Sequence, residues 1–437
     1  MLEKLFHDHV ATLASRAAAV LSATGFDGLV ISSGKPFTYF ADDQDAPFRR
    51  VAHFAHWTPL AGPSHLLVFT PGSKPKLVRH APEDYWYEQA PLGSPFWASE
   101  FDITECGSAA KVWAQCPKGA KWAYIGDEPD AAKAAGIPES GLNPKTVVAR
   151  LDWDRSLKTA YEVKCLEEAT HRAALGHRAA LTAFGNGASE LEIHHAYVQE
   201  CGCVDSELPY GSIVALDEKG AILHYEGKRT QHGGKVLLID AGAPCRGYGS
   251  DITRTWCTPQ AHPVFRQLVS DLDGLQRALC DGVKVGRPYL DLHIASHEGI
   301  ADILHRNGVL KRGGASAVQD GLTRPFFPHG LGHFLGIQVH DVSGRQAAPE
   351  GGVLAPPAEH PYLRTTRTIT AGQVFTIEPG IYFIPMLLRD LKSSKHQADV
   401  NWSLVDALIP MGGIRIEDNL VVTATGHRNL TRECLPD

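Results

Sequence analysis

The sequence predicts an α+β protein with two domains. Over residues 1–155, helix-like and strand-like segments alternate, which indicates a mixed α/β amino-terminal domain. Over residues 156–437, strand patterns surround long helices, which predicts a larger domain with a largely antiparallel sheet flanked by helices. The length of 437 residues exceeds the usual span of one hydrophobic core and agrees with two domains.

The amino-terminal domain is predicted to open with an amphipathic helix that carries Leu2, Leu5, Leu13 and Leu21 on one face. The apolar runs 28–31 and 122–125 predict strands. Segments 66–70 and 76–79 flank the turn-rich piece Pro71 to Pro75, which predicts a hairpin. No phosphate-cradling glycine motif accompanies these strands, so a nucleotide site is not predicted here.

The second domain is predicted to begin after a boundary near Asp152 to Lys158. A long helix is expected from Thr159 to Ala183, closed by Gly185-Asn-Gly187. Ser189 and Glu192 form a capping-box pattern that predicts the start of a second helix. Further strands are expected at 211–216, 221–225, 235–240, 251–256, 373–378 and 412–423, further helices near 263–282 and 289–307, and a Pro-rich loop at 354–361.

Composition narrows the function classes. Hydrophobic residues make up 43% and charged residues 21%, as in ordinary globular proteins. The net charge is -7 without a dense basic tract, which argues against nucleic acid as a partner. The amino end lacks the pattern of a secretory signal, and no run reaches the roughly 18 apolar residues of a membrane span. Nine scattered cysteines predict reduced thiols and a cytoplasmic location.

Two aspartates carry the first sign of chemistry. Asp240 ends the apolar strand Lys235-Val-Leu-Leu-Ile, and Asp251 follows eleven residues later, beyond a turn. A hairpin would place both carboxylates side by side, where like charges repel unless they are protonated or bridged by a cation. Taken alone, either residue is equally well read as a turn aspartate that caps local amides.

Histidine and glutamate residues further along extend this set. His329 and His333 stand four residues apart in a glycine-rich segment, and this spacing does not decide which of them would bind a metal. Glu378 and Glu417 each interrupt an apolar strand, where an unpaired ionised carboxylate is costly to bury. Carboxylates with imidazole suit divalent ions such as Mn²⁺ or Co²⁺. Two cations that share carboxylates and hold a hydroxide between them would indicate a hydrolase.

The motifs that hold these residues resemble those of the pita-bread metallopeptidases. They are Ile-Asp240-Ala-Gly, Ser-Asp251-Ile-Thr-Arg-Thr-Trp, His-Gly-Leu-Gly-His333, Ile-Glu378-Pro-Gly-Ile-Tyr and Gly-Ile-Arg-Ile-Glu417-Asp. Segments 208–216, 221–225 and 354–357 are similar to the bacterial Xaa-Pro dipeptidase (prolidase) branch, which includes organophosphorus acid anhydrolases. The resemblance is dense over residues 150–430 and thinner before them, where Asp84-Tyr-Trp86 and the Asp42-Asp43 segment carry it.

The resemblance implies a two-metal site and a pita-bread fold for the second domain. Asp240 and Asp251 would bind one ion, His333 and Glu378 the other, with Asp251 and Glu417 bridging. The ions implied are two per chain, Mn²⁺ or alternatively Co²⁺. Phe334 departs from the pattern of many relatives, which have a second consecutive histidine there, and so does the pair Ser206-Glu207.

Residues around the metals follow from the same resemblance. It assigns proton transfer to Glu378 and contacts with the substrate or transition state to His224, His329 and His340. Arg415 and Arg367 would recognise a substrate carboxylate, and Tyr210, Tyr289 and Leu363 would line the pocket. Without the resemblance, other interpretations stay open: a core role for His224, Tyr289 or Leu363, a local His340-Asp341 pair, and an ion pair of Arg415 with Glu417.

The function expected is cleavage of Xaa-Pro dipeptides through a metal-bridging hydroxide, with possible side activity on organophosphate triesters. The alternatives are an Xaa-Pro aminopeptidase that acts on longer peptides and a metal-free binding protein on the same fold. The resemblance also implies a homodimer formed through the amino-terminal domain, whose Asp43 or Trp86 would then reach a neighbour's pocket.

Overall fold

The computed structural model describes residues 1–119 and 121–435 and divides into two compact units. The first unit contains Met1–Val163 together with Gln346–Gly352, and the second contains Lys164–Arg345 and Val353–Asp437. The helix α6 (Ala160–Gly185) therefore starts in the first unit and runs on through the second. No helix in the described part of the chain is long and apolar enough to cross a membrane.

The first unit is built on a five-stranded mixed sheet in the order β4-β3-β2-β1-β5. β1 pairs antiparallel with β2 and parallel with β5, and the expected hairpin is present as the antiparallel pair of β2 and β3. The elements are α1 (Leu2–Thr24), β1 (Gly28–Ser32), α2 (Ala52–Trp57), β2 (Leu66–Phe69), β3 (Lys76–His80), β4 (Asp102–Cys106), α3 (Ala109–Trp113), β5 (Trp122–Ile125), α4 (Pro129–Ala134) and α5 (Lys145–Arg155).

A hairpin from late in the sequence belongs to the first unit. It consists of β11 (Gln346–Ala348) and β12 (Gly351–Val353). The side-chain amide of Gln346 donates to the carbonyl of Ala149 at 2.8 Å, and Arg150 pairs with Glu350 at 2.7 Å. These contacts tie the hairpin to α5, an attachment that the sequence patterns did not predict.

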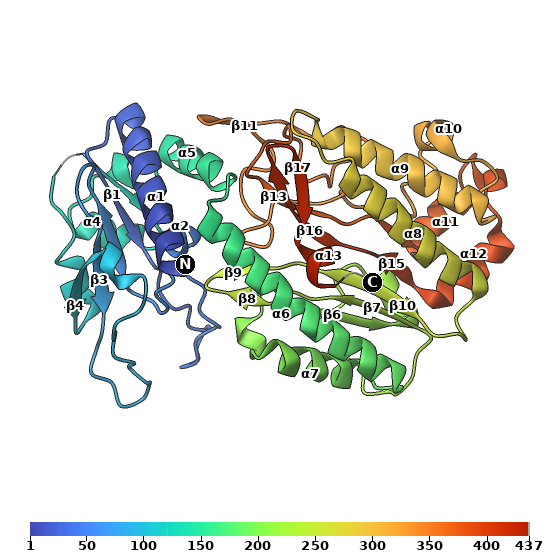
Figure 1. Ribbon diagram of the computed structural model, residues 1–437, viewed down its shortest axis with the longest axis horizontal. Coiled ribbons are helices and arrows are strands. Elements are labelled where there is room, and N and C mark those ends of the chain that lie inside the picture. Colours follow the sequence, from blue (N-terminus) through green and yellow to red (C-terminus); the bar gives the residue numbers. More distant parts are fainter. Residues whose placement is uncertain (120, 436–437) are drawn as a thin grey trace. The chain divides into compact units, whose positions relative to one another are not determined.

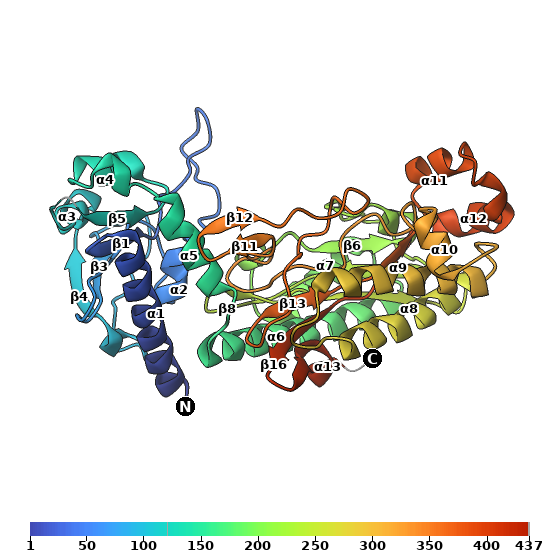
Figure 2. The ribbon, with the colours of Figure 1, turned by 90° about the horizontal axis from the view of Figure 1, so that it is seen from above.

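Helices flank the strands of the second unit. The helices are α6, α7 (Glu190–Cys201), α8 (Pro263–Asp281), α9 (Tyr289–Arg306), α10 (Gly314–Gln319), α11 (Pro385–Lys392), α12 (Trp402–Leu408) and α13 (Leu430–Cys434). The predicted capping box is present, since Ser189 and Glu192 each satisfy the other's backbone amide. α8 and α9 lie side by side in both views (Figures 1 and 2).

The strands of the second unit pair antiparallel throughout the described ladders, as predicted. They are β6 (Ile213–Leu216), β7 (Val236–Asp240), β8 (Pro244–Cys245), β9 (Tyr248–Gly249), β10 (Thr253–Cys257), β13 (Val374–Ile377), β14 (Gly380–Tyr382), β15 (Gly413–Arg415), β16 (Asp418–Thr423) and β17 (Gly426–Asn429). The main sheets are ordered β10-β7-β6 and β13-β16-β17, and β14 pairs with β15.

Two strand predictions need correction. Residues 221–225 form no strand, because the chain leaves β6 through a 3₁₀ turn over Asp217–Ala221 and continues as a turn. The predicted strand 412–423 is divided into β15 and β16. The predicted strand 373–378 is present as β13, and a further strand, β14, follows it. Glu378 lies between β13 and β14 and Glu417 between β15 and β16, where the backbone changes partner strand.

Candidate metal centre

Asp240 and Asp251 lie side by side at one end of the β7–β10 ladder, as the hairpin prediction required. Asp240 is the last residue of β7 and faces Thr253, the first residue of β10. The turn between the strands is tight at Gly242, where a Cβ atom would stand 1.9 Å from the carbonyl oxygen of Ser250. Only glycine fits this close approach.

The phenol of Tyr210 lies between the two aspartates. Its oxygen is 2.8 Å from Oδ1 of Asp240 and 2.5 Å from Oδ1 of Asp251. Burial and the two negative charges raise the pKa of Tyr210 well above its usual value, so the hydroxyl keeps its proton. Because the hydroxyl has one proton, it donates to one carboxylate at a time. Tyr210 is therefore a direct hydrogen-bond partner of the two aspartates.

Glu417 joins this group through Thr253. The amide of Glu417 donates to the carbonyl of Thr253 at 3.0 Å, and the Thr253 hydroxyl donates to Oε2 of Glu417 at 2.7 Å. The other carboxylate oxygen, Oε1, is buried and has no hydrogen-bond partner within residues 1–119 and 121–435. A buried carboxylate oxygen without a partner is costly, and a cation would remove that cost.

His333 is held by a segment that runs along β13. The amide of Thr376 donates to the carbonyl of His333 at 3.0 Å, and the amide of Glu378 donates to that of Leu331 at 2.8 Å. Gly332 allows this contact, because a Cβ there would meet the carbonyl oxygen of Thr376 at 2.1 Å. Gly332 is therefore required by packing against β13.

The ring of His333 points its Nε2 atom at the carboxylates. Nδ1 lies 3.0 Å from the carbonyl of Phe334 and must donate to it, which leaves the lone pair on Nε2. Nε2 is 3.4 Å from Oδ2 of Asp251, 3.7 Å from Oε1 of Glu378 and 3.9 Å from Oε1 of Glu417. One ligand atom each of Asp251, His333 and Glu417 lies within 4.8 Å of the others, as in a metal site.

The electrostatics of the cluster favour cations. Burial, followed by repulsion from Asp240, raises the pKa of Asp251 well above its usual value. Burial and the charge of Glu417 raise the pKa of Glu378, and burial and the charge of Asp251 raise that of Glu417. Such a set of carboxylates is stable in the ionised form only with compensating positive charge. The donors present fit two divalent cations.

Arg415 supplies part of that compensation. Its guanidinium lies 2.6 Å from Oδ2 of Asp240 and donates to the hydroxyl of Tyr382 at 2.8 Å. The predicted ion pair with Glu417 is therefore replaced by one with Asp240. Since Tyr382 accepts from Arg415, its own proton is directed to Nε2 of His329 at 2.8 Å.

The same contacts fix the state of His329. Its Nδ1 lies 2.8 Å from the carbonyl of Gly330 and donates to it, while Nε2 accepts from Tyr382. Burial and the charge of Arg415 lower the pKa of His329 to about 3, so the ring is neutral. Nδ1 is also 3.7 Å from Oε2 of Glu378, which places His329 beside the cluster without making it part of the compact ligand set. Tyr382 was quoted in a motif, but sequence reasoning assigned it no role.

Two further histidines lie on exposed segments. His340 is exposed, and its ring meets that of His333 edge to face at 4.4 Å between centroids. His224 is exposed in the turn that follows Asp217–Ala221. The interpretation of His224 as a core residue is therefore wrong, because the strand that would have buried it does not form.

Tyr289, expected to line the pocket, and Arg367, expected to recognise a substrate carboxylate, are both buried. Tyr289 is completely buried, and its hydroxyl donates to the carbonyl of Thr376 at 2.8 Å. It therefore has the core role that the sequence left open. Leu363 is likewise completely buried. Arg367 is buried, donates to the hydroxyl of Ser343 at 2.7 Å and lies 5.7 Å from the centre of the Phe334 ring. Burial lowers the pKa of Arg367 to about 10, which leaves it charged at neutral pH.

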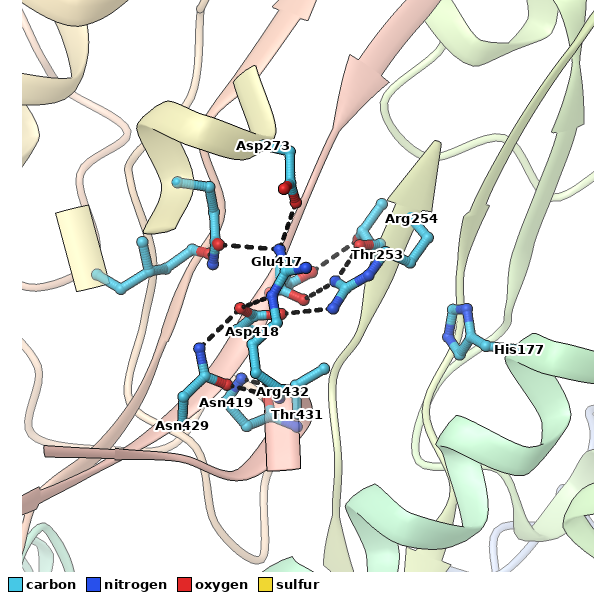
Figure 3. Close-up of polar contacts among 12 residues, drawn as sticks. His177, Thr253, Arg254, Asp273, Glu417, Asp418, Asn419, Asn429, Thr431 and Arg432 are labelled. Carbon is cyan, nitrogen blue, oxygen red and sulfur yellow. Dashed lines mark hydrogen bonds and ion pairs between the residues drawn. The ribbon is translucent and has the colours of Figure 1, made fainter. Parts of the chain in front are cut away.

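A buried ionic network supports the strands behind the cluster (Figure 3). Asp418 follows Glu417 and accepts from Arg254 at 2.8 Å, while Arg254 also donates to the carbonyl of Glu417 at 2.9 Å. Arg432 donates to Asp418 at 2.8 Å and to Asp273 at 2.6 Å. These contacts fix the backbone that presents Glu417, a role that the sequence patterns did not reveal.

Comparison with known proteins agrees with this geometry. The family described as "Metallopeptidase family M24" matches residues 164–424, and this range includes all five proposed ligands. The chain belongs to metallopeptidase family M24. A second family, "Xaa-Pro dipeptidase, N-terminal domain", matches residues 4–153. Membership of this metallopeptidase family supports binding of divalent metal, and the carboxylate cluster is a candidate site for it.

Relatives within the M24 family match the whole chain. It is 41% identical over 439 residues to an Xaa-Pro dipeptidase of Pseudoalteromonas atlantica, covering 99% of this chain and 98% of the relative. It is 42% identical over 431 residues to an Xaa-Pro dipeptidase of Stenotrophomonas maltophilia strain K279a, covering 98% and 96%.

Solved structures share the fold. Zinc-substituted aminopeptidase P of E. coli, in complex with product, superimposes with a TM-score of 0.75 at 22% identity, over 98% of this chain and 95% of that one. Proline aminopeptidase P II of Yersinia pestis gives a TM-score of 0.75 at 23% identity, over 99% and 97%. The expected pita-bread architecture of the second domain is therefore confirmed.

Proposed function

We propose that this M24 enzyme is an Xaa-Pro dipeptidase, which hydrolyses the bond between a first residue and a terminal proline. The observation that carries the proposal is the buried cluster of Asp240, Asp251, His333, Glu378 and Glu417, in which Oε1 of Glu417 lacks a partner among the described residues. Full-length identity of 41–42% to Xaa-Pro dipeptidases supplies the substrate class.

The metal ligands are assigned as the family resemblance implies. Asp240 and Asp251 would hold one cation, His333 and Glu378 the other, and Asp251 and Glu417 would bridge them. The predominance of carboxylate oxygens supports Mn²⁺, with Co²⁺ as the alternative. When bound, the two cations polarise the scissile carbonyl and acidify the attacking water.

Proton transfer is assigned to Glu378. Its buried carboxylate lies beside the neutral ring of His329, with 3.7 Å between Oε2 and Nδ1. A carboxylate with a raised pKa is suited to take a proton from water and to return it to the leaving proline nitrogen. His224 and His340 are proposed to contact the substrate and stabilise the oxyanion that develops on the carbonyl, and His329, whose nitrogens are engaged by Gly330 and Tyr382, is proposed to orient the substrate.

Recognition of the dipeptide carboxylate is assigned to Arg367. Arg415 was the other candidate, but its guanidinium is engaged by Asp240 and Tyr382. Arg367 carries a buried charge beside Phe334, the neighbour of the metal ligand His333. A charge-assisted hydrogen bond from Arg367 to a terminal carboxylate would favour dipeptides over longer chains.

The first unit is proposed to mediate a homodimer. It exposes a group of large aromatic side chains, which are costly to leave in water and are enriched at interfaces. These residues are Phe37, Tyr39, Phe40, Tyr85, Trp86 and Tyr87. A cytoplasmic location is proposed because all nine cysteines, each among the described residues, are free thiols.

A substrate panel tests the activity. Purified protein is chelated, and hydrolysis of several Xaa-Pro dipeptides and one Xaa-Pro-Yaa tripeptide is measured with and without added Mn²⁺. The dipeptidase should act only with metal and should prefer dipeptides; faster cleavage of the tripeptide would instead indicate an aminopeptidase. Asp251→Asn should abolish the activity while far-UV circular dichroism stays unchanged, because the amide is nearly isosteric but cannot bridge two cations. A phosphotriester in the same panel measures the side activity.

A further inference from the structure

Three histidines meet in the second unit outside the carboxylate cluster. His293 and His297 stand four residues apart on α9, so their side chains lie on one face of the helix. His360 comes from the loop that precedes β13. One nitrogen from each ring lies within 4.8 Å of the others, and the ring centroids are 4.4 to 4.8 Å apart.

Three of the ring nitrogens in this group lack hydrogen-bond partners among the described residues. Both ring nitrogens of His293 and Nε2 of His297 are buried, and nothing in the described part of the chain forms a hydrogen bond with them. The side chains of His293 and His297 are each 1% exposed. Buried polar atoms without partners are rare because each costs about 1–3 kcal/mol. Three such nitrogens in one place indicate a ligand.

The surroundings prepare the rings to bind a cation. The hydroxyl of Thr323 lies 2.8 Å from Nδ1 of His297 and orients that ring, which leaves Nε2 toward the other histidines. The ring of Phe327 packs against His293 and His297 and forms an apolar wall. Burial and mutual repulsion lower the pKa of His293 to about 2, and burial lowers that of His297 to about 3. Neutral imidazole is the form that binds metals.

A cavity reaches His360, the half-buried member of the group. It has a volume of about 290 Å³ and is lined by His360 and Phe327 together with Glu359, Asp390 and Arg324. Burial, together with the charge of Arg324, lowers the pKa of His360, and the charge of Glu359 partly opposes this. Through this cavity a cation could reach the group from the side of His360, and water could complete its coordination there.

A comparable triad in the first unit serves as a contrast. His9, His56 and Glu162 also bring their ligand atoms within 4.8 Å. There, however, His9 uses Nδ1 for the hydroxyl of Thr159 at 2.8 Å and Nε2 for the carbonyl of His56 at 2.7 Å, and His56 pairs with Glu162 at 3.3 Å. In that group both ring nitrogens of His9 have hydrogen-bond partners and Nε2 of His56 faces a carboxylate of the same group, so the group is held together by its own contacts.

We propose that His293, His297 and His360 form a Zn²⁺ site separate from the carboxylate cluster. Imidazole nitrogens suit a borderline cation such as Zn²⁺, whereas the carboxylate cluster suits harder ions. Zn–N bonds of about 2.0–2.1 Å bring tetrahedral ligand atoms to about 3.4 Å from one another, so nitrogens that lie within 4.8 Å need only small movements to bind the ion. The ion would then fasten the loop of His360 to α9.

Fastening this loop has a structural consequence near His329. Residues Tyr362 to Arg364 pack against Gly330, where a Cβ atom would meet the backbone of Leu363 at 2.9 Å. Gly330 follows His329 directly, and its carbonyl accepts the His329 Nδ1 proton. Zinc at the three histidines is therefore expected to stabilise the fold around this loop, with no part in the chemistry.

Variants distinguish zinc binding at the three histidines from metal binding at the carboxylate cluster. The double variant Asp251→Asn/Glu417→Gln removes ligands of the carboxylate cluster and serves as the background. In this background, chelated protein is titrated with Zn²⁺ by calorimetry, bound zinc is counted after gel filtration, and thermal unfolding is followed with and without Zn²⁺. The proposal predicts one tightly bound zinc per chain and a higher unfolding midpoint with the metal.

Adding His360→Gln to the background should weaken Zn²⁺ binding on the order of a hundredfold or more and remove the thermal shift. Adding His305→Gln, on the same helix but outside the group, should change neither quantity. Because His360 is only half-buried and lies in a loop, its variant is expected to fold, which the unfolding curve without metal checks. Absence of a tight zinc in the background, or unchanged zinc binding in the His360→Gln variant, would overturn the proposal.

Discussion

Arg415 and Asp240 form a buried ion pair across 175 residues of sequence, with 2.6 Å between Nη2 and Oδ2. The guanidinium also acts on the other carboxylates, since its charge is among the factors that hold down the pKa of Asp251, Glu378 and Glu417. Four ionised carboxylates and one guanidinium still leave negative charge in excess. Arg415 therefore orients one ligand, while divalent cations must supply the remaining compensation.

Replacing Arg415 by Met should damage metal binding together with catalysis. Loss of a charge-assisted hydrogen bond worth about 1.5–3 kcal/mol corresponds to roughly ten- to a hundredfold in kcat/KM. Asp240 would lose its ion-pair partner, so less metal should remain bound. Hydrolysis of dipeptides and, where detectable, of phosphotriesters should then fall by the same factor. Arg415→Lys, which keeps the positive charge, should retain part of the metal binding and part of the activity. Selective loss on dipeptides with full metal content would instead make Arg415 the carboxylate anchor.

Arg367→Met provides the complementary experiment. If Arg367 binds the terminal carboxylate of the substrate, KM for dipeptides should rise, with a loss of roughly ten- to a hundredfold in kcat/KM. A phosphotriester has no carboxylate, so its hydrolysis should change little, and bound metal should stay at the level of the parent enzyme. Steady-state kinetics on both substrates with metal analysis check this. An equal loss on both would exclude the anchor role.

Tyr382→Phe should lower kcat more than it changes KM. The hydroxyl accepts from Arg415 and donates to Nε2 of His329, so its removal leaves His329 without the donor that orients it. Loss of one such hydrogen bond, about 1 kcal/mol, predicts a fall of roughly fivefold in kcat. Tyr362→Phe changes an exposed phenol and is the matched control. Unchanged kcat in Tyr382→Phe would remove this hydroxyl from the mechanism.

Local patterns predicted much of the fold, and the reason is visible in particular elements. The capping box at Ser189 and the helix expected over 289–307 depend on neighbours within a few residues, and both are present. The strand expected over 221–225 was wrong, since the chain turns after β6. Glu378 and Glu417 stood out because each interrupts an apolar run, and the structure places each where one strand gives way to the next.

Contacts distant in sequence could not be predicted in the same way. Arg415 was considered a partner of Glu417 because the two are neighbours on a strand, yet its partner comes from β7. The pair of Arg254 with Asp418 joins residues 164 positions apart and leaves no local trace. His293 and His297 did carry a signal, their four-residue spacing on a predicted helix, but the third member of the group comes from a distant loop.

Arg254→Met should destabilise the fold strongly. Arg254 is buried and pairs with Asp418, which is also completely buried, so the substitution leaves a carboxylate with Arg432 and Asn429 as its remaining donors in Figure 3. Breaking a buried pair typically costs about 3–5 kcal/mol. Arg428→Met, which removes exposed ion pairs with Glu167 and Glu433, should cost less than about 1 kcal/mol. Chemical denaturation of chelated protein measures both, and similar values for the two variants would contradict the prediction.

The stability of the enzyme toward acid should depend on His177. Its ring is fully buried, and its Nε2 donates to the carbonyl of Ala241 at 3.0 Å, one residue beyond the ligand Asp240. Burial lowers the pKa of His177 from 6.5 to about 4. Below pH 6.5, His177 therefore binds a proton in the unfolded chain but stays neutral in the folded chain. The free energy of unfolding falls between pH 6.5 and about 4 as a result, by an amount on the order of 3 kcal/mol.

His177→Gln should make this pH dependence shallower. A glutamine amide can still donate to the Ala241 carbonyl but does not titrate, so the proton uptake by the unfolded chain that destabilises the fold in acid disappears. The measurement is the free energy of unfolding of chelated protein at intervals from pH 7 to pH 4.5, and the comparison is the slope, because the substitution also changes packing against Tyr197 and Trp256. His171→Gln, at an exposed position of the same helix, should keep the parent slope. If His177→Gln also kept that slope, the folded protein would have to accommodate a charged His177, and the burial that lowers its pKa would not govern acid stability.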